Sequence, residues 1–163
     1  MSEIKEHRKD GSGLLQLVSF VVGTEEFGVD ISCVQEINRM LQITKVPNAP
    51  EYVTGIINLR GRVIPVIELR KRLGLSPKDY DKHTRIIVIE VSGKTVGFIV
   101  DAVKEVIRIS QNITEAPPEL TAGVNSEFIK SVGKLEDRLL ILLDLDKIFN
   151  SKEKEKVFET ILP

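Results

Sequence analysis

The segment VTGIINLRGRVIPVIEL, residues 53–69, decides the fold of this chain. It contains two apolar runs, residues 56–57 and 63–67, separated by a polar bend that includes Gly61. The second run is β-branched except for Pro65, and charged residues follow directly. This pattern predicts a buried strand that is entered through a bend. Because Pro65 has no N–H to donate, we expect the strand to lie at a barrel edge or a bulge at that point.

Arg60 stands in this bend with apolar residues on both sides. A guanidinium in such a place must reach water or find a carboxylate. Glu36 is the expected partner, because a charge-assisted hydrogen bond from Arg60 would fix the bend. The alternative is a solvated Glu36.

The same pattern returns later in the chain. Residues 129–145 repeat residues 53–69 at a shift of 76 positions, and residues 86–91 repeat residues 17–22 at a shift of 69. The matched landmarks are Gly28 with Gly97, Val34 with Val103, Glu36 with Glu105, Tyr52 with Phe128, Arg62 with Arg138, and Glu68 with Asp144. They occur in the same order in both halves, which indicates one structural unit used twice. The alternative is chance similarity between apolar strands.

Short strands separated by Gly- and Pro-containing turns, with little helix, predict an all-β fold of two small five-stranded barrels. We expect residues 1–13 to be a disordered tail and residues 14–150 to form a single domain. Within that domain, residues 14–79 would build the first barrel and residues 84–150 the second. Residues 151–163 are predicted to form a C-terminal helix that packs on the barrels.

Composition excludes several classes of protein. The 163 residues carry 23 basic and 24 acidic side chains, so no excess charge favours binding to nucleic acid. The single cysteine, Cys33, allows no internal disulfide and indicates a reducing compartment. No signal peptide is recognisable, and no run approaches the roughly 20 apolar residues of a membrane helix. A cytosolic protein without membrane insertion is expected.

The sequence offers no candidate catalytic base, nucleophile, cofactor motif or metal site. His7 lies in the tail and His83 in the connector between the halves, where neither is placed for catalysis or metal binding. Small barrels that bind nucleic acid or proline-rich peptides use aromatic platforms, but this chain has no Trp. A protein-binding module remains. An enzyme of unrecognised type is the alternative, and a pocket with a perturbed titratable group would reveal it.

Two barrels side by side would leave a groove. Residues 34–37 and 103–106 are its equivalent edges under the repeat. Val34 and Val103 would be apolar contacts if exposed; otherwise they belong to the core.

Four blocks of sequence carry a family resemblance. They are FGVDISCVQEI (27–37), GIINLRGRVIPVIELR (55–70), VGFIVDAV (96–103) and DRLLILLDL (137–145). In these blocks the chain resembles the CheW family of chemotaxis coupling proteins, from about residue 14 to residue 150. The resemblance implies two five-stranded SH3-like barrels and no catalytic activity or cofactor. It further implies binding to the cytoplasmic tip of chemoreceptors and to the regulatory domain of the histidine kinase CheA, in the cytoplasm at membrane-associated receptor arrays.

The resemblance also implies site residues. The receptor-binding set is Val34, Glu36, Gly97, Val103 and Val106, with Arg60 and Glu36 holding the groove in shape. The kinase-binding set is Gly55, Glu115, Glu119 and Leu120. Some relatives carry a basic residue and an aromatic residue in the segment 115–120, where this chain has Glu115 and Leu120. A similar adaptor of a non-chemotaxis pathway, such as one for pilus motility, is the alternative function.

Overall fold

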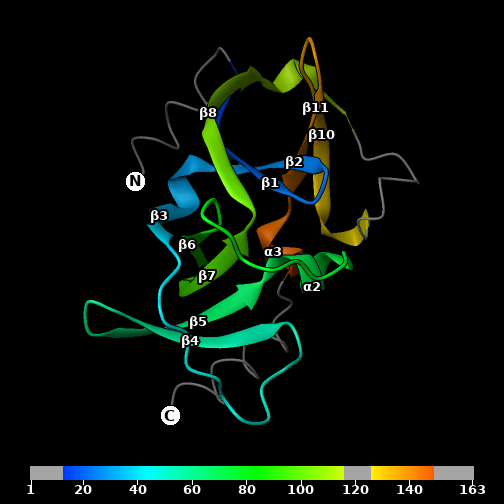
Figure 1. Cartoon of the computed structure of the whole chain (residues 1–163). Coiled ribbons are helices and arrows are strands. Elements are labelled where there is room, and N and C mark those ends of the chain that lie inside the picture. The colour runs from blue at the N-terminus through cyan, green and yellow to red at the C-terminus, as the bar shows by residue number, and fades with distance from the viewer. Residues whose placement is uncertain (1–12, 116–125, 149–163) are drawn as a thin grey trace.

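The computed structural model describes residues 13–115 and 126–148 of the chain, which form two β-sheets (Figure 1). The first sheet has the strand order β8-β1-β2-β11-β10-β9. Its strands are β1 (Leu14–Val22), β2 (Glu25–Asp30), β8 (Ala102–Ser110), β9 (Thr114–Glu115), β10 (Ile129–Lys134) and β11 (Leu139–Leu143). The second sheet has the order β3-β6-β7-β5-β4. Its strands are β3 (Val34–Arg39), β4 (Val53–Leu59), β5 (Arg62–Glu68), β6 (Arg85–Val91) and β7 (Lys94–Val100).

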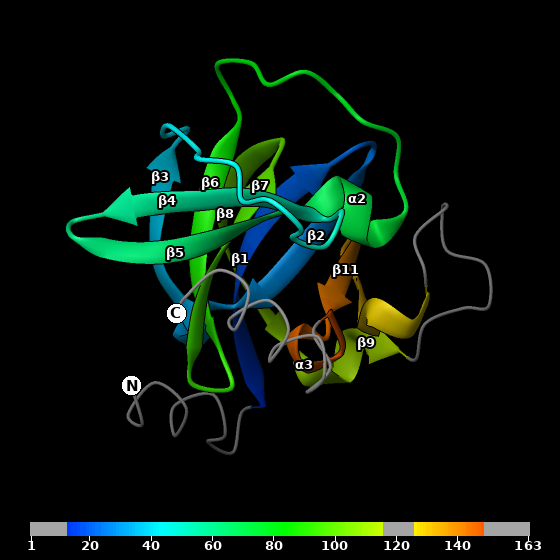
Figure 2. The ribbon, with the colours of Figure 1, turned by 90° about the horizontal axis from the view of Figure 1, so that it is seen from below.

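Short helices occupy the connections. They are η1 (Ile31–Cys33), α2 (Leu69–Leu73), η2 (Gln111–Ile113), η3 (Ser126–Phe128) and α3 (Leu145–Ile148). In Figure 2 the connector after α2 arcs over the sheets to reach β6. The predicted all-β class is confirmed. The first sheet has a sixth strand because the two residues of β9 add to β10. The predicted C-terminal helix lies outside the described residues.

The expected division into one barrel from each half of the chain is wrong. Strands β1 and β2 come from the first half, yet they pair with β8 and β11 of the second half. Strands β6 and β7 of the second half lie between β3 and β5 of the first. Each sheet therefore combines one hairpin from one half with strands of the other half: β1–β2 with four strands in the first sheet, and β6–β7 with three in the second.

The register of the strand pairing nevertheless repeats between the two sheets. In the first sheet, Leu142 of β11 lies opposite Gly28 of β2; in the second, Val66 of β5 lies opposite Gly97 of β7. These pairs are equivalent under the shifts of 76 and 69 positions. Register shifts interrupt the β1–β8 and β6–β3 ladders at equivalent points, as they do the β10–β11 and β4–β5 ladders. Duplication explains this match, because chance similarity of apolar strands would not reproduce the irregularities.

Arg72 and Ile148, which are equivalent positions of the two halves, contact each other. The Arg72 Nε donates a hydrogen bond of 2.8 Å to the Ile148 carbonyl oxygen. The Arg72 guanidinium carbon also lies 4.6 Å from the ring centre of Tyr52 and 4.8 Å from that of Phe128. These two rings are again repeat partners. Arg72 thus joins both halves by a cation–π contact on each side.

Apolar side chains fill three layers. The central core lies between the sheets and includes Phe20, Phe27, Ile87 and Phe98. The opposite face of the second sheet buries a separate cluster around Ile57, Ile64, Val66, Ile86 and Val88. The opposite face of the first sheet buries the equivalent cluster around Leu17, Ile107, Leu140 and Leu142. Because the inner strands are apolar on both faces, they appear in the sequence as nearly continuous hydrophobic runs.

Of the two expectations for Pro65, the edge strand is wrong, since β5 lies between β7 and β4. The other, a bulge, has an irregularity close by, because the β4–β5 register shifts between the pairs Val53–Ile67 and Gly55–Val66. Pro65 faces Ile56 of β4, and the pairing of β5 with β7 covers residues 66–68. The proline therefore lies just outside the β5–β7 ladder, where its missing N–H interrupts no pair.

Candidate protein-binding site

Strand β3 ends the second sheet and presents alternating half-buried and exposed residues. Val34 lies opposite Ile89 and packs on the central core as a half-buried side chain. Ile37 lies opposite Ile87 on the same face, but 41% of its surface is exposed. We call residues 34–37 the β3 edge. Its apolar side chains start in the core and reach the surface.

Strand β8 ends the first sheet in the equivalent way. Val103 lies opposite Phe20 and packs on the same central core. Val106 lies opposite Val18 and is 55% exposed. We call residues 103–106 the β8 edge. The valines at positions 34 and 103 are thus neither fully buried nor fully exposed, and both are half-buried at the rim of the core.

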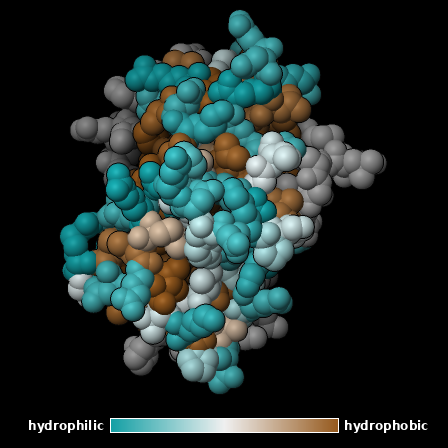
Figure 3. Space-filling view, in the orientation of Figure 1, coloured by the Kyte–Doolittle hydropathy of each residue, from teal (hydrophilic) through white to brown (hydrophobic). Residues whose placement is uncertain are grey.

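Ile37 is an exposed apolar residue that was missing from the predicted receptor-binding set. The signal that could have found it is the repeat, which places Ile37 on Val106. On the face shown in Figure 3, apolar surface appears between β3 and the β4–β5 hairpin, and hydrophilic side chains border it. Exposed apolar side chains of this kind mark surfaces that other proteins can cover.

A tight turn brings Arg60 to the β3 edge. Arg60 and Gly61 both have positive φ angles, 52° and 83°, which is the geometry of a two-residue hairpin turn that matches the twist of the strands. The Asn58 Oδ1 accepts a hydrogen bond of 2.9 Å from the Gly61 N–H and supports this turn. The turn therefore presents the Arg60 guanidinium to β3, where the guanidinium binds Glu36.

Glu36 has a second partner that the sequence did not suggest. The Asn38 Nδ2 donates to the Glu36 Oε1 at 2.8 Å. The hydrogen bond from Asn38 and the hydrogen bond and charge of Arg60 hold the pKa of Glu36 below its ordinary value, and the charge of Arg62 acts in the same direction. The side chain of Arg60 is 72% exposed, so this ion pair contributes little to the stability of the fold. It links the β4–β5 turn to the β3 edge.

Gly97 does not lie on a surface. It is buried in β7, and a Cβ built there would stand 2.9 Å from the Ile86 Cγ2 and 3.6 Å from the Val66 Cγ2. Its absent side chain makes room for the apolar cluster of the second sheet. The assignment of Gly97 to a contact surface is corrected accordingly: it is a packing residue of β7, which β6 separates from β3.

Gly55 is also buried, where β4 meets the preceding loop. Its φ angle is 157°, and a Cβ there would stand 2.2 Å from the Thr44 carbonyl oxygen. Thr44 and Ile56 exchange backbone hydrogen bonds of 2.9 and 2.8 Å beside it. Gly55 therefore permits the close approach of the loop at residues 43–44. Because Gly55 is itself buried, it can affect a partner surface only by positioning that loop.

The remaining predicted kinase contacts are only partly described. Glu115 is exposed at the end of β9 and forms an ion pair of 2.7 Å with Lys134 of β10. Glu119 and Leu120 lie outside the described residues. The structure thus brings one of these three residues to the outer edge of the first sheet, far along the sheet order from β8.

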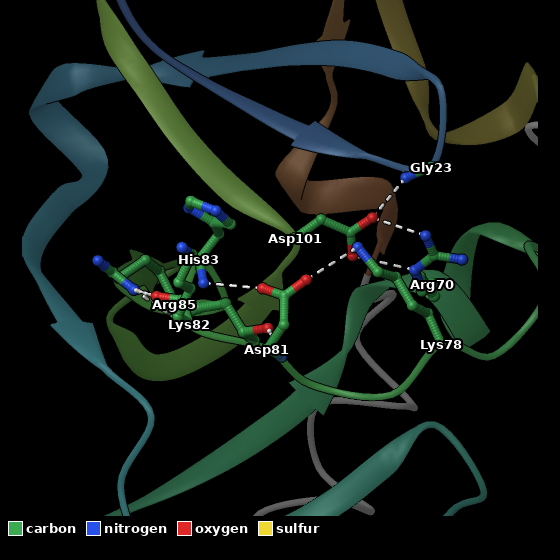
Figure 4. A network of polar contacts seen from close by, with 9 residues as sticks. Gly23, Arg70, Lys78, Asp81, Lys82, His83, Arg85 and Asp101 are labelled. Atoms are coloured by element: carbon green, nitrogen blue, oxygen red, sulfur yellow. Dashed lines mark hydrogen bonds and ion pairs between the residues drawn. The ribbon is translucent and has the colours of Figure 1, made fainter.

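The two sheets are fixed to each other by Asp101, at the junction of β7 and β8 (Figure 4). The Arg70 Nε and Nη2 donate to its two carboxylate oxygens at 3.0 and 2.6 Å, and the Gly23 N–H donates to the Oδ2 at 2.8 Å. Burial alone would raise the pKa of Asp101, but the Arg70 hydrogen bond and the Gly23 N–H lower it. Asp101 thus links α2, which follows β5 of the second sheet, to the β1–β2 turn of the first sheet. The bidentate pair with Arg70 makes one side of this link, and the hydrogen bond from Gly23 makes the other.

The described residues show no group of three His, Cys, Asp or Glu side chains placed to hold a metal ion. Within the same residues, no helix has both the length and the apolar character needed to cross a membrane.

Comparison with known proteins identifies the family. The model of the CheW-like domain matches residues 16–153. The chain is 35% identical over 155 residues to the chemotaxis protein CheW of Rhizobium meliloti, which covers 95% of this chain and 99% of that protein. It is 37% identical over 136 residues to the chemotaxis protein CheW of Thermotoga maritima, covering 82% and 86% of the two chains.

A solved structure shows the same architecture. The crystal structure of the scaffolding protein TtCheW from Thermoanaerobacter tengcongensis matches with a TM-score of 0.79 and 41% sequence identity, over 86% of this chain and 96% of that one. Sequence, strand topology and structural similarity agree, and the chain belongs to the CheW-like family of non-catalytic chemotaxis adaptor proteins.

Proposed function

We propose that this chain couples the cytoplasmic tip of chemoreceptors to the regulatory domain of the kinase CheA. The observation that carries the proposal is the pair of repeat-related edges. Each presents an exposed apolar side chain, Ile37 or Val106, above a half-buried valine on the central core. An amphipathic helix from a receptor tip can lay its apolar face across such side chains.

The receptor surface comprises the β3 and β8 edges, with Val34, Ile37, Val103 and Val106 as its apolar residues. Glu36 and Arg60 contribute by orienting the β4–β5 hairpin at the border of this surface. Gly97 contributes indirectly, by permitting dense packing of β7 against Ile86 and Val66 in the second sheet. A single edge offers little apolar area, so we infer moderate affinity that increases when many copies are held together in an array.

The kinase surface lies elsewhere. We infer that β4 and the loop at residues 43–44, held close by Gly55, form its main part. Glu115 would belong to a second kinase contact at the outer edge of the first sheet, together with Glu119 and Leu120. Separate surfaces would allow one chain to bind receptor and kinase at once, and so to be recruited to membrane-associated receptor arrays from the cytoplasm.

The test is a pair of titrations by calorimetry, one with a receptor-tip fragment and one with the isolated CheA regulatory domain. The expected result is binding to both, with the affinity for each unchanged when the other is already saturating. Binding to neither partner would overturn the coupling role. Mutual exclusion would overturn the assignment of two separate surfaces.

A further inference from the structure

A polar cluster lies behind the β8 edge, on the face of the first sheet that carries the apolar cluster around Leu17. Neighbouring strands supply its members: Lys104 and Glu105 from β8, Ser19 from β1, Glu26 from β2, and Arg138 directly before β11. Because β8, β1, β2 and β11 are consecutive in the sheet, the cluster runs across four adjacent strands.

Arg138 is the hub of this cluster. Its Nε donates to the Glu26 Oε1 at 2.7 Å, and its Nη1 donates to the Asp137 Oδ1 at 3.0 Å. Its Nη2 lies 3.7 Å from the Glu105 Oε1. One guanidinium therefore connects the β10–β11 hairpin to β2 and to the β8 edge.

The carboxylate at the centre is buried. Glu26 is 8% exposed, and it accepts a hydrogen bond from the Ser19 hydroxyl, whose residue has no exposed surface. Lys104 Nζ lies 3.7 Å from the Glu26 Oε1. Burial alone would raise the pKa of Glu26, but the hydrogen bonds from Ser19 and Arg138 and the charges of Arg138 and Lys104 hold it below its ordinary value. A buried charge satisfied in this way fixes the groups around it.

The repeat shows what this cluster replaces. On the β3 edge, Arg60 binds Glu36, while Arg62 donates from its Nη2 to the Thr95 hydroxyl at 3.1 Å. In the first sheet the residue equivalent to Arg60 is Glu136, which cannot hold another carboxylate. Arg138, the equivalent of Arg62, is the arginine that remains.

We propose that Arg138 is the positioning residue of the β8 edge, with the role that Arg60 has on the β3 edge. Glu105 lies opposite Ser19, directly after the register shift that separates it from Val103, and Val106 follows Glu105 in the chain. Holding Glu105 and Ser19 through Arg138 and Glu26 therefore sets the direction in which Val103 and Val106 leave the sheet. The proposal rests on the proposed function, since it assigns Val103 and Val106 to the receptor surface.

Two variants test the proposal, so that one can decide if the other does not fold. Arg138→Ala removes the hub, and Glu105→Gln weakens only the arm to β8 while leaving Glu26 paired. Arg138→Lys is the conservative variant that restores a charge near Glu26 without the fork to Glu105. Arg108→Ala is the matched control, because it removes an exposed arginine from β8 outside the cluster.

The first measurement is the methyl NMR spectrum of the full chain without any partner. Arg138→Ala and Glu105→Gln are expected to shift the methyl signals of Val103 and Val106, and to leave those of Val34 and Ile37 in place. Folded variants with unchanged β8 methyl signals would overturn the proposal. If Arg138→Ala does not fold, Glu105→Gln alone decides by the same criterion.

The second measurement is binding to a receptor-tip fragment and to the CheA regulatory domain. Arg138→Ala is expected to weaken receptor binding by about fivefold and to leave kinase binding unchanged. Arg138→Lys should recover part of the loss, and Arg108→Ala should bind as the unmodified chain does. An equal loss for both partners would indicate a merely structural role and overturn the proposal. If the unmodified chain binds no receptor tip, the proposed function fails, whereas the methyl spectra still decide whether Arg138 positions β8.

Discussion

The β3 edge and the β8 edge share strand pairing, register shift and apolar rim, but they are held by different polar contacts. On the β3 edge, Arg60 reaches Glu36 from a solvent-exposed turn. On the β8 edge, Arg138 reaches Glu105 while it also binds the buried Glu26. The comparison teaches that burial of the apolar side chains constrains the backbone of both copies. The polar contacts differ between the two copies, but in each copy an arginine lies beside the glutamate of the edge.

The largest expected effect comes from the β4 strand, whose equivalent in the first sheet is β10. Gly55→Ala should destabilise the chain by about 3 kcal/mol, because the added Cβ collides with the Thr44 carbonyl. The equivalent position is Ser131, which already has a side chain, so Ser131→Gly should cost only about 0.5–1 kcal/mol. Urea unfolding of both variants measures the difference. An equal loss of unfolding free energy in both variants would show that the loop at residues 43–44 moves to accommodate the added Cβ. It would remove this contrast between the sheets.

The next effect concerns receptor binding at the β3 edge and the β8 edge. Val106→Glu and Ile37→Glu should each weaken binding to a receptor-tip fragment about tenfold, because each places a charge in an apolar contact. Both side chains are exposed, so the midpoint of thermal unfolding should hardly change. Leu14→Glu is the control, since Leu14 is an exposed apolar residue at the far end of β1. A loss of affinity in only one of the two variants would show that the β3 edge and the β8 edge are not functionally equivalent.

Glu26 and Glu36 should differ in how much each contributes to the loss of stability in acid. Fold contacts lower the pKa of Glu26 from 4.5, so its contribution to stability is complete above that pH and is lost as the pH falls through its folded value. Glu26→Gln should therefore reduce the loss of stability between about pH 5 and pH 3, by less than about 2 kcal/mol. The pKa of Glu36 is lowered too, but Glu36 is the more exposed group, so Glu36→Gln should have a smaller effect. Urea midpoints at three pH values test this order, which a larger effect of Glu36→Gln would contradict.

The smallest effect is expected from Arg60→Ala. Glu36 keeps its hydrogen bond from Asn38, and the lost ion pair is exposed, so thermal unfolding should be nearly unchanged. Receptor affinity should fall by about two- to threefold and should lose part of its dependence on salt. A marked drop in thermal stability would mean that Arg60 holds the fold as well as the hairpin.

Several features of the site could be predicted from the sequence. The duplication located both edges, because matched apolar residues imply matched strand pairing. The bend at Arg60 required a carboxylate, and Glu36 is that partner. Ile37 could have been found in the same way, since its repeat partner Val106 was already in the predicted set.

Other features could not be predicted, for physical reasons. A hairpin such as β1–β2 can satisfy the same hydrogen bonds with strands of its own half or with those of the other half, so local pattern does not decide between them. A glycine in a strand pattern looks the same whether it faces a partner or, as with Gly97, a neighbouring side chain.

The exchange of strands between the halves has a consequence for the isolated repeat unit. A single copy, from β1 to β5, would have the outer strands that another copy's β1–β2 hairpin needs, while its own hairpin would lack the strands that flank it here. Expressed alone, such a unit should be insoluble or should assemble as a two-fold symmetric dimer with swapped hairpins. In the present chain the connector after α2 converts that dimer into one polypeptide. Covalent linkage is also what frees the two copies to acquire unlike surfaces, which a symmetric dimer could never present.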